Sequence, residues 1–246
     1  MKVAIITPYF KESDSTLERC HASVLNQTYP NIHHIMIADG HPSAWCEERS
    51  GSYLSKMKLE HITFPKSHND AGATPRALGA LSAFSRGFDA VAFLDADNWY
   101  EPDHIEIMVD KMKTENLGAV VATRTIYSTE CKFMYVDLIE SKIENTVDTN
   151  CWLLNKSLYK FMPAWITDKP NHLISDMIFC KVLKANKITM AQVSKPTVCY
   201  VSNWGWHYEQ AKLPIPIDAV WLAKESNGDH IKVTEQQKLK LLKELK

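Results

Sequence analysis

The sequence predicts an α/β protein built on a mostly parallel, twisted sheet with helices on both faces. Short apolar runs alternate with helical patterns through the first half of the chain, and turn-forming or acidic residues end each run. This order favours a parallel sheet, because two parallel strands need a crossover connection that usually contains a helix. We expect one domain over residues 1–230, with halves at 1–115 and 116–230, and a C-terminal basic helix over 231–246.

The strands expected in the first half are short and rich in β-branched or other apolar residues. Pro8 follows the first strand, Asp39-Gly40 the second and Pro65 the third. Proline cannot donate to a strand ladder, and glycine favours a turn, so these residues are natural strand ends. The expected strands are residues 3–7, 34–38, 61–64 and 90–94, with a fifth beginning at 119.

Helices are expected between these strands, where residues of capping type mark their starts. Ser15 to Glu18 form an S-x-x-E capping box, which predicts a helix start at Ser15. Thr74-Pro75 combines N-cap and first-position chemistry, and Pro102 also suits a first turn. The helices expected are one from Ser15, a weaker one over 44–57, and two over 74–88 and 102–115.

The second half of the chain has a less regular pattern. An apolar stripe predicts a helix over 174–185, and two β-rich runs predict strands over 188–193 and 197–201. Leucines at helical spacing among lysines predict a tail helix from residue 234. Such a helix could lie on an anionic membrane, although we favour a solvated or dimer-forming helix.

The composition is that of a globular protein, with 45% apolar residues and a formal net charge of −1. These values exclude a disordered chain, and they give no general attraction to nucleic acid, so no nucleic-acid partner is expected. The six cysteines form no C-x-x-C pair, which argues against a zinc cluster. With no signal-peptide core and no bilayer-length apolar run, we expect a cytoplasmic protein without a transmembrane segment, able to be peripheral at the inner membrane surface.

Polar clusters follow the predicted strands at the edge where a parallel sheet binds its ligands. The clusters are residues 7–9, 39–40, 66–74 and 95–97, and we expect some of them to meet in the fold. In the last cluster, Asp95 and Asp97 close a buried strand and lie about 6.5–7 Å apart if extended. Two such carboxylates can share a divalent cation, Mn²⁺ or Mg²⁺, which can bridge diphosphate oxygens. The alternative is that Asp97 or Asn98 is only a turn or cap residue.

Three stretches together resemble the opening of family 2 glycosyltransferases. They are the first strand with Thr7-Pro8-Tyr9-Phe10, the run S-V-L-N-Q-T-Y-P-N over 23–31 followed by a strand and Asp39-Gly40, and Asp95-Ala96-Asp97. The resemblance is close over residues 1–115 and loose beyond. It implies the GT-A fold, a nucleotide-binding α/β/α sandwich, with a nucleotide-diphosphate-sugar site in the N-terminal half and an acceptor site in the C-terminal half.

The resemblance also implies roles for individual residues in the N-terminal half. Asp39 would accept a hydrogen bond from the base, although Ala38 stands where the family usually has a second acid. Asp97 would bind the metal, and Arg76 would lie near the sugar or phosphates or only balance charge on its helix. The residues that would line the nucleotide-sugar pocket are Thr7, Pro8, Tyr9, Asp39, Asn69, Gly72, Arg76, Asp95 and Ala96.

In the C-terminal half, the resemblance makes Asp176 the catalytic base, at a helix start with Ser175 where the family usually has Glu. The alternatives are an ordinary first-turn aspartate, which the helix dipole favours, or Asp148 as the base. His207 is the candidate for a further metal ligand, since imidazole suits manganese-like ions. Residues that would shape the acceptor pocket are Asn150, Trp152, Trp204 and Trp206, and the last two could instead fill the core.

These features favour a metal-dependent inverting glycosyltransferase that uses a nucleotide-diphosphate sugar, with UDP-sugars preferred. The acceptor would be a hydroxyl of a saccharide, a lipid-linked saccharide or a protein, and the absence of Q-x-x-R-W after Asp176 indicates single additions. A sugar-phosphate nucleotidyltransferase is disfavoured because residues 8–15 contain no glycine, and a dehydrogenase because G-x-G-x-x-G is absent. A degenerate relative that binds carbohydrate or nucleotide without turnover remains an alternative.

Overall fold

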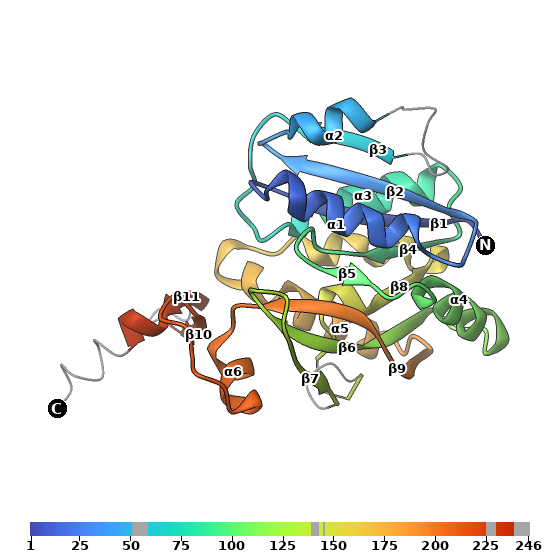
Figure 1. The fold of residues 1–246 in the computed structure, drawn as a ribbon. Helices are drawn as coiled ribbons and strands as arrows, with labels where there is room; N and C mark the ends of the chain where they lie inside the picture. The colour runs from blue at the N-terminus through green and yellow to red at the C-terminus, as the bar shows by residue number, and fades with distance from the viewer. Residues whose placement is uncertain (51–58, 139–142, 145, 225–229, 239–246) are drawn as a thin grey trace.

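The computed structural model describes residues 1–50, 59–138, 143–144, 146–224 and 230–238. It shows a curled, mostly parallel sheet flanked by helices, with a separate two-stranded hairpin near the C-terminal end (Figure 1). The sheet strands are β1 (Val3–Tyr9), β2 (Ile32–Asp39), β3 (Leu59–Phe64), β4 (Ala90–Phe93), β5 (Trp99–Tyr100), β6 (Ala119–Ser128), β7 (Phe133–Asp137), β8 (Trp152–Asn155) and β9 (Met190–Ser202), and the hairpin strands are β10 (Val220–Lys224) and β11 (His230–Thr234).

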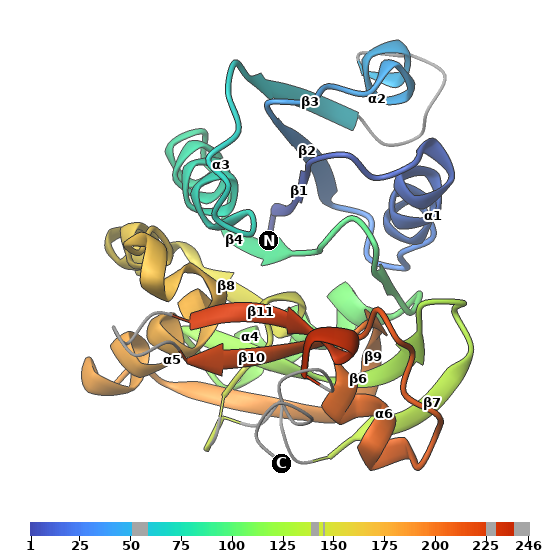
Figure 2. The same ribbon diagram turned by 90° about the vertical axis from the view of Figure 1, so that its left-hand side faces the viewer.

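Helices connect these strands and cover both faces of the sheet. Figure 2 shows the N-terminal strands between α3 on one side and α1 and α2 on the other. The α-helices are α1 (Asp14–Leu25), α2 (Ala44–Arg49), α3 (Ala73–Ser85), α4 (His104–Thr114), α5 (Ser175–Ala185) and α6 (Gly205–Ala211), and the 3-10 helices are η1 (Thr149–Cys151), η2 (Lys156–Trp165) and η3 (Lys169–Ile174). None of the helices in the described ranges combines the length and apolar character that a bilayer crossing needs.

The strand order is β3-β2-β1-β4-β8-β6-β9-β5, with β7 paired to β6. The four N-terminal strands are parallel, as the sequence predicts, and β6 is parallel to β9. Strand β8 is antiparallel to both of its neighbours, and β5 and β7 are antiparallel edge pairings. The predicted α/β class and mostly parallel sheet are therefore confirmed, with β8 joining the two halves.

Local cap chemistry differs from the prediction at two helices. Ser13, and not Ser15, is the N-cap of α1, and its side chain accepts from the Thr16 N–H at 3.3 Å. Helix α3 begins after Gly72, whose φ of 80° is the left-handed conformation that glycine adopts without strain. The N–H of Thr74 donates to the Asp70 carboxylate at 2.8 Å, so Thr74 lies inside the helix and is not its cap.

The C-terminal part departs from the predicted elements as well. The two strands expected over 188–193 and 197–201 form one strand, β9, with register shifts that accommodate Pro196. Within the basic helix expected over 231–246, residues 230–234 form β11 instead. Residues 235–238 are helical, and the rest of that expected helix, 239–246, lies outside the described residues. Of the helix expected over 44–57, the structure shows α2 at Ala44–Arg49, and residues 51–57 lie outside the described residues.

Candidate active site

Two cavities lie side by side at the carboxyl ends of the strands. The N-terminal cavity, of about 510 Å³, includes the ends of β1 and β2 and residues 95–97. The C-terminal cavity, of about 500 Å³, includes the start of α5 and residues 146–149. The residues that line both are Ala71, Arg76, Asp95, Tyr200, Trp204 and Lys232. The two cavities therefore meet around Asp95, and the β10–β11 hairpin contributes to both.

The N-terminal cavity gathers nearly all of the residues predicted for the nucleotide-sugar site. Eight of the nine line it: Pro8, Tyr9, Asp39, Asn69, Gly72, Arg76, Asp95 and Ala96. Asp97, the predicted metal ligand, lines it as well. Thr7 is the exception, since its side chain is fully buried and its hydroxyl lies 2.8 Å from His34 Nε2. Thr7 is a core residue, and its predicted place in the pocket lining is wrong.

Asp39 holds the loop after β3 against the end of β2. Its carboxylate accepts from the Ser67 hydroxyl at 3.0 Å and from the His68 N–H at 3.0 Å, and lies 2.6 Å from His68 Nδ1. Glycine is required beside it, because a Cβ on Gly40 would lie 2.4 Å from the Ser67 nitrogen. Asp39 therefore shapes the cavity wall through this loop, and its predicted contact with a base would have to share these hydrogen bonds.

Asp95 is fixed from both sides by buried polar groups. One carboxylate oxygen forms an ion pair with Arg76, and the other accepts from Asn150 Nδ2 at 3.0 Å. The Asp95 N–H also donates to Asn150 Oδ1 at 2.6 Å. Asn150 is fully buried, so it positions Asp95 and does not line either cavity as an acceptor contact. Trp152 is likewise a core residue of β8, where it packs edge-on against Phe179.

Asp97 is less constrained than Asp95. It is exposed to the solvent of the N-terminal cavity, and within the described chain its carboxylate has no hydrogen bond from another residue. Desolvation by the surrounding protein, and then the negative charges of Asp95 and Glu12, raise the pKa of Asp97 to about 7. A cation here would relieve the repulsion between these carboxylates.

His207 does not join Asp97. It lines only the C-terminal cavity, where Nδ1 lies 2.5 Å from the Ser202 hydroxyl and Nε2 lies 3.5 Å from Arg124 Nη2. Across the described ranges, no cluster of three or more His, Cys, Asp or Glu side chains is arranged to hold a metal. Of the two predicted metal ligands, Asp97 has the open carboxylate that a divalent cation would need, and the structure does not bring His207 to it.

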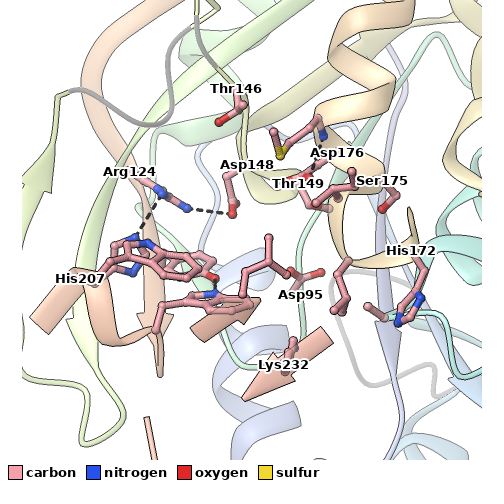
Figure 3. Close-up of a pocket in the computed structure, with 18 of the residues that line it drawn as sticks. Asp95, Arg124, Thr146, Asp148, Thr149, His172, Ser175, Asp176, His207 and Lys232 are labelled. Carbon is pink, nitrogen blue, oxygen red and sulfur yellow. Dashed lines mark hydrogen bonds and ion pairs between the residues drawn. The ribbon is translucent and has the colours of Figure 1, made fainter. Parts of the chain in front are cut away.

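Asp176 faces the C-terminal cavity from the first turn of α5, with Asp148 and Asp95 around the same space (Figure 3). Its carboxylate accepts from the Met177 N–H at 2.7 Å. Burial, and then the charge of Asp148, raise the pKa of Asp176 to about 7, while Arg124 opposes this shift. A carboxylate with a pKa near neutrality is suited to take up a proton during a reaction.

Asp148, the alternative base, is committed to other groups. Arg124 Nη1 donates to one of its oxygens at 2.9 Å. The backbone N–H and the side-chain amide of Asn150 both donate to the other oxygen, each at 2.9 Å. Arg124 is buried and also paired with Asp137 at 2.8 Å, so this network is rigid. The geometry therefore favours Asp176 over Asp148 as a base.

Two tryptophans form an aromatic wall. Trp204 and Trp206 stack with ring centroids 4.3 Å apart and 21° between their planes, and both line the C-terminal cavity. The indole N–H of Trp204 donates to the Tyr200 hydroxyl at 3.1 Å. Both rings line a cavity, and their predicted contact with an acceptor by stacking on a sugar face stays a prediction.

Sequence reasoning missed several residues of the site. The most informative are Tyr200, Arg124 and Lys232, which come from β9, β6 and β11. Tyr200 and Arg124 belong to no recognisable sequence motif. Each lies in a strand, and the order of the strands in the sheet, which the sequence does not show, decides what lies beside it. Lys232 was one lysine within an expected helix, and only the hairpin brings it to the cavities.

Comparison with known proteins identifies the family. The model of the family described as glycosyl transferase family 2 matches residues 4–172. The chain belongs to glycosyl transferase family 2. The match spans β1 to η3, and thus includes the strand ends that form the N-terminal cavity.

Two relatives match parts of this family 2 chain. The succinoglycan biosynthesis protein ExoW of Rhizobium meliloti is 33% identical over 104 residues, which are 42% of this chain and 32% of the relative. The glycosyltransferase GlyA of Streptococcus pneumoniae is 27% identical over 151 residues, which are 60% of this chain and 20% of the relative. The matches thus span about a third and a fifth of the two relatives' lengths.

Solved structures share the fold at low sequence identity. A fragment of S. aureus TarS in complex with UDP has a TM-score of 0.63 and 12% identity, and the match covers 86% of this chain and 63% of the fragment. The same fragment in complex with UDP-GlcNAc has a TM-score of 0.62 and 13% identity, with 85% and 61% covered. These matches confirm the GT-A fold predicted for this family 2 protein.

Proposed function

We propose that this protein is an inverting glycosyltransferase that moves a sugar from a nucleoside diphosphate sugar to a hydroxyl acceptor. The observation that carries the proposal is the junction of the two cavities at Asp95. It places a carboxylate-rich cavity beside one that contains a carboxylate with a raised pKa. Family membership and the name of the relative GlyA support the same activity class.

In this proposal the N-terminal cavity binds the donor and the C-terminal cavity binds the acceptor. The acceptor hydroxyl attacks the anomeric carbon while its proton passes to the Asp176 carboxylate. The bond from the anomeric carbon to the diphosphate oxygen breaks, and the nucleoside diphosphate leaves with the electron pair. Attack from the side opposite the leaving group inverts the anomeric centre. Trp204 and Trp206 would orient the acceptor by stacking.

Asp97 would hold a divalent cation, Mn²⁺ or Mg²⁺, together with the diphosphate oxygens. When bound, the cation supplies positive charge to the diphosphate. Asp95, held by Arg76 and Asn150, would orient the ribose or the transferred sugar. UDP-sugars are the proposed donors, which agrees with the UDP and UDP-GlcNAc complexes of TarS. The acceptor would be a hydroxyl of a saccharide, a lipid-linked saccharide or a protein, and the enzyme would add one sugar to it. With a lipid-linked acceptor, the protein would act at the membrane surface.

A nucleotide panel tests this proposal. We expect UDP to raise the melting temperature in the presence of Mn²⁺, and to do so much less in EDTA. Asp97→Asn should lose the part of the shift that depends on the cation. Asp110→Asn, which removes an exposed aspartate of α4 that lines neither cavity, should behave as wild type. Absence of a shift with any nucleoside diphosphate in Mn²⁺ or Mg²⁺ would refute the proposal.

A further inference from the structure

The β10–β11 hairpin places one lysine where the two cavities meet. Lys232 lines both cavities, and its ammonium lies 5.1 Å from the centroid of the Trp204 ring. Its cross-strand partner in the hairpin is Leu222, which lines the C-terminal cavity. Lys232 is more than 130 residues from the aspartates after β4, so only the hairpin brings it to the site.

The charge balance of the N-terminal cavity makes this lysine distinctive. Among the described residues that line this cavity, Arg76 and Lys232 are the cationic side chains. Arg76 is committed to Asp95 through their ion pair and to the Ala71 carbonyl at 2.7 Å. Within the described chain, Lys232 has no hydrogen bond or salt bridge at its ammonium. It is therefore the positive charge that an anionic ligand can recruit without breaking an existing ion pair.

Lys232 lies within the electrostatic influence of the two aspartates that follow β4. Desolvation lowers the pKa of Lys232 from its ordinary value, while the charges of Asp97 and Asp95 act in the opposite direction. The ammonium thus feels both carboxylates, yet none is within ion-pair distance in the described residues. An anionic ligand that enters the N-terminal cavity together with a divalent cation would therefore lie near the Lys232 ammonium as well as the two carboxylates.

Hydrogen bonds and packing hold the β10–β11 hairpin, which carries Lys232, against the neighbouring chain. The Val220 N–H donates to the Asn203 carbonyl at 2.7 Å, and the Trp221 indole N–H donates to Glu235 at 2.5 Å. Trp221 also packs on Gly205, where a Cβ would lie 2.2 Å from the indole ring. Figure 2 shows the hairpin in front of the C-terminal half.

We propose that Lys232 binds the diphosphate of the donor and neutralises the leaving nucleoside diphosphate, which makes the β10–β11 hairpin part of the active site. The inference rests on the proposed function, since it requires a diphosphate donor in the N-terminal cavity. As the C1–O bond breaks, negative charge grows on the diphosphate oxygen, and an ammonium within contact stabilises it. The hairpin thereby links donor binding to the wall of the acceptor cavity.

Lys232→Met tests this role, because it keeps much of the side-chain length and removes the charge. We expect it to weaken UDP binding about 5- to 30-fold and to lower kcat by a similar or larger factor. Uridine, which lacks phosphate, should bind the variant and the wild type within about twofold of each other. Lys232→Arg should restore much of the loss, and Lys132→Met, at an exposed lysine of the β6–β7 turn, should change neither ligand.

The outcomes separate this inference from the proposed function. Binding would be measured by calorimetry for UDP and by ligand-detected NMR for uridine, at one fixed Mn²⁺ concentration. If the wild type binds UDP and turns over but Lys232→Met matches it, the role of Lys232 is refuted while the function stands. Equal losses for UDP and uridine would also refute it, because they would indicate a structural role for the hairpin. If the wild type binds no nucleoside diphosphate, the proposed function itself fails.

Discussion

Asp176→Asn removes the carboxylate in the first turn of α5 while keeping its size. The amide oxygen of asparagine can still accept the hydrogen bond from the Met177 N–H. In the wild type, burial and then Asp148 raise the pKa of Asp176 from 3.8 to about 7. At about pH 8 the carboxylate is ionised in both the folded and the unfolded protein. The charge is desolvated in the folded protein alone, so it lowers the free energy of unfolding.

The size of this cost follows from the pKa change. A shift from 3.8 to about 7 corresponds to about 4 kcal/mol, and solvent in the cavity screens it, so we expect about 1–2 kcal/mol. Because the folded pKa lies above the unfolded one, the folded protein binds more protons between about pH 4 and 7. Wild-type stability attributable to Asp176 therefore falls across this window and is constant above it. The asparagine variant should melt about 2–8 °C higher at about pH 8, and the gain should be smaller at about pH 5.

Activity should change in the opposite direction to stability. Loss of the base should lower kcat by about 10²–10⁴-fold, while UDP binding should stay within about twofold of wild type. In the wild type, the rate should rise with pH until about 7, because Asp176 must lose its proton before it can act as a base. Initial rates and melting curves at both pH values, with Asp110→Asn as the control, measure all of these effects. A variant that keeps turnover, or that gains more stability at pH 5 than at pH 8, would refute the reasoning.

Three further variants test the construction of the site. Asp97→Asn should weaken UDP binding in Mn²⁺ about tenfold or more but not in EDTA, and equal binding in both would contradict a cation at Asp97. Asn150→Ala leaves the Asp95 N–H without its partner and should cost about 1–3 kcal/mol, seen as a lower melting temperature. Gly205→Ala places a Cβ 2.2 Å from the Trp221 ring and should cost about 1–3 kcal/mol with weaker UDP binding, and an unchanged melting temperature would show that the hairpin adjusts.

The N-terminal half could be predicted well because its elements depend on local patterns. Strands β1 to β4 are short apolar runs, and parallel pairing brings their carboxyl ends to one edge. Strands β2 and β3 end directly before Gly40 and Pro65, as predicted, but the predicted end of the first strand at Pro8 is wrong, because β1 continues through Pro8 to Tyr9. The family resemblance assigned nine residues to the nucleotide-sugar pocket, and eight of them line the N-terminal cavity, as does Asp97. Thr7 was misplaced because it lies two residues before the end of β1, where the hydroxyl lies beside His34 and, at 3.9 Å, the Cys20 thiol of α1.

The C-terminal half resisted prediction because its geometry depends on contacts distant in sequence. Asn150 and Trp152 were assigned to an acceptor pocket, yet the antiparallel strand β8 inserts between β4 and β6 and buries both residues. No local pattern shows that insertion. The family resemblance made His207 the candidate for a further metal ligand, but the buried Arg124 and Ser202 hold its ring nitrogens in the other cavity.

The charges around Asp95 explain why a divalent cation and Lys232 of the hairpin would serve the same purpose, which is to supply positive charge to a bound diphosphate. Arg76 is balanced by Asp95, so a diphosphate entering the N-terminal cavity meets the unpaired carboxylate of Asp97 and gains no net attraction from this pair. Binding must then bring in positive charge, either as a divalent cation at Asp97 or as the ammonium of Lys232. If both contribute, removing Lys232 should increase the dependence of UDP binding on Mn²⁺, and removing the cation should increase the effect of Lys232→Met. A double-mutant cycle over Asp97 and Lys232 would measure this coupling, and additive losses in free energy would show that the two charges act on the diphosphate independently.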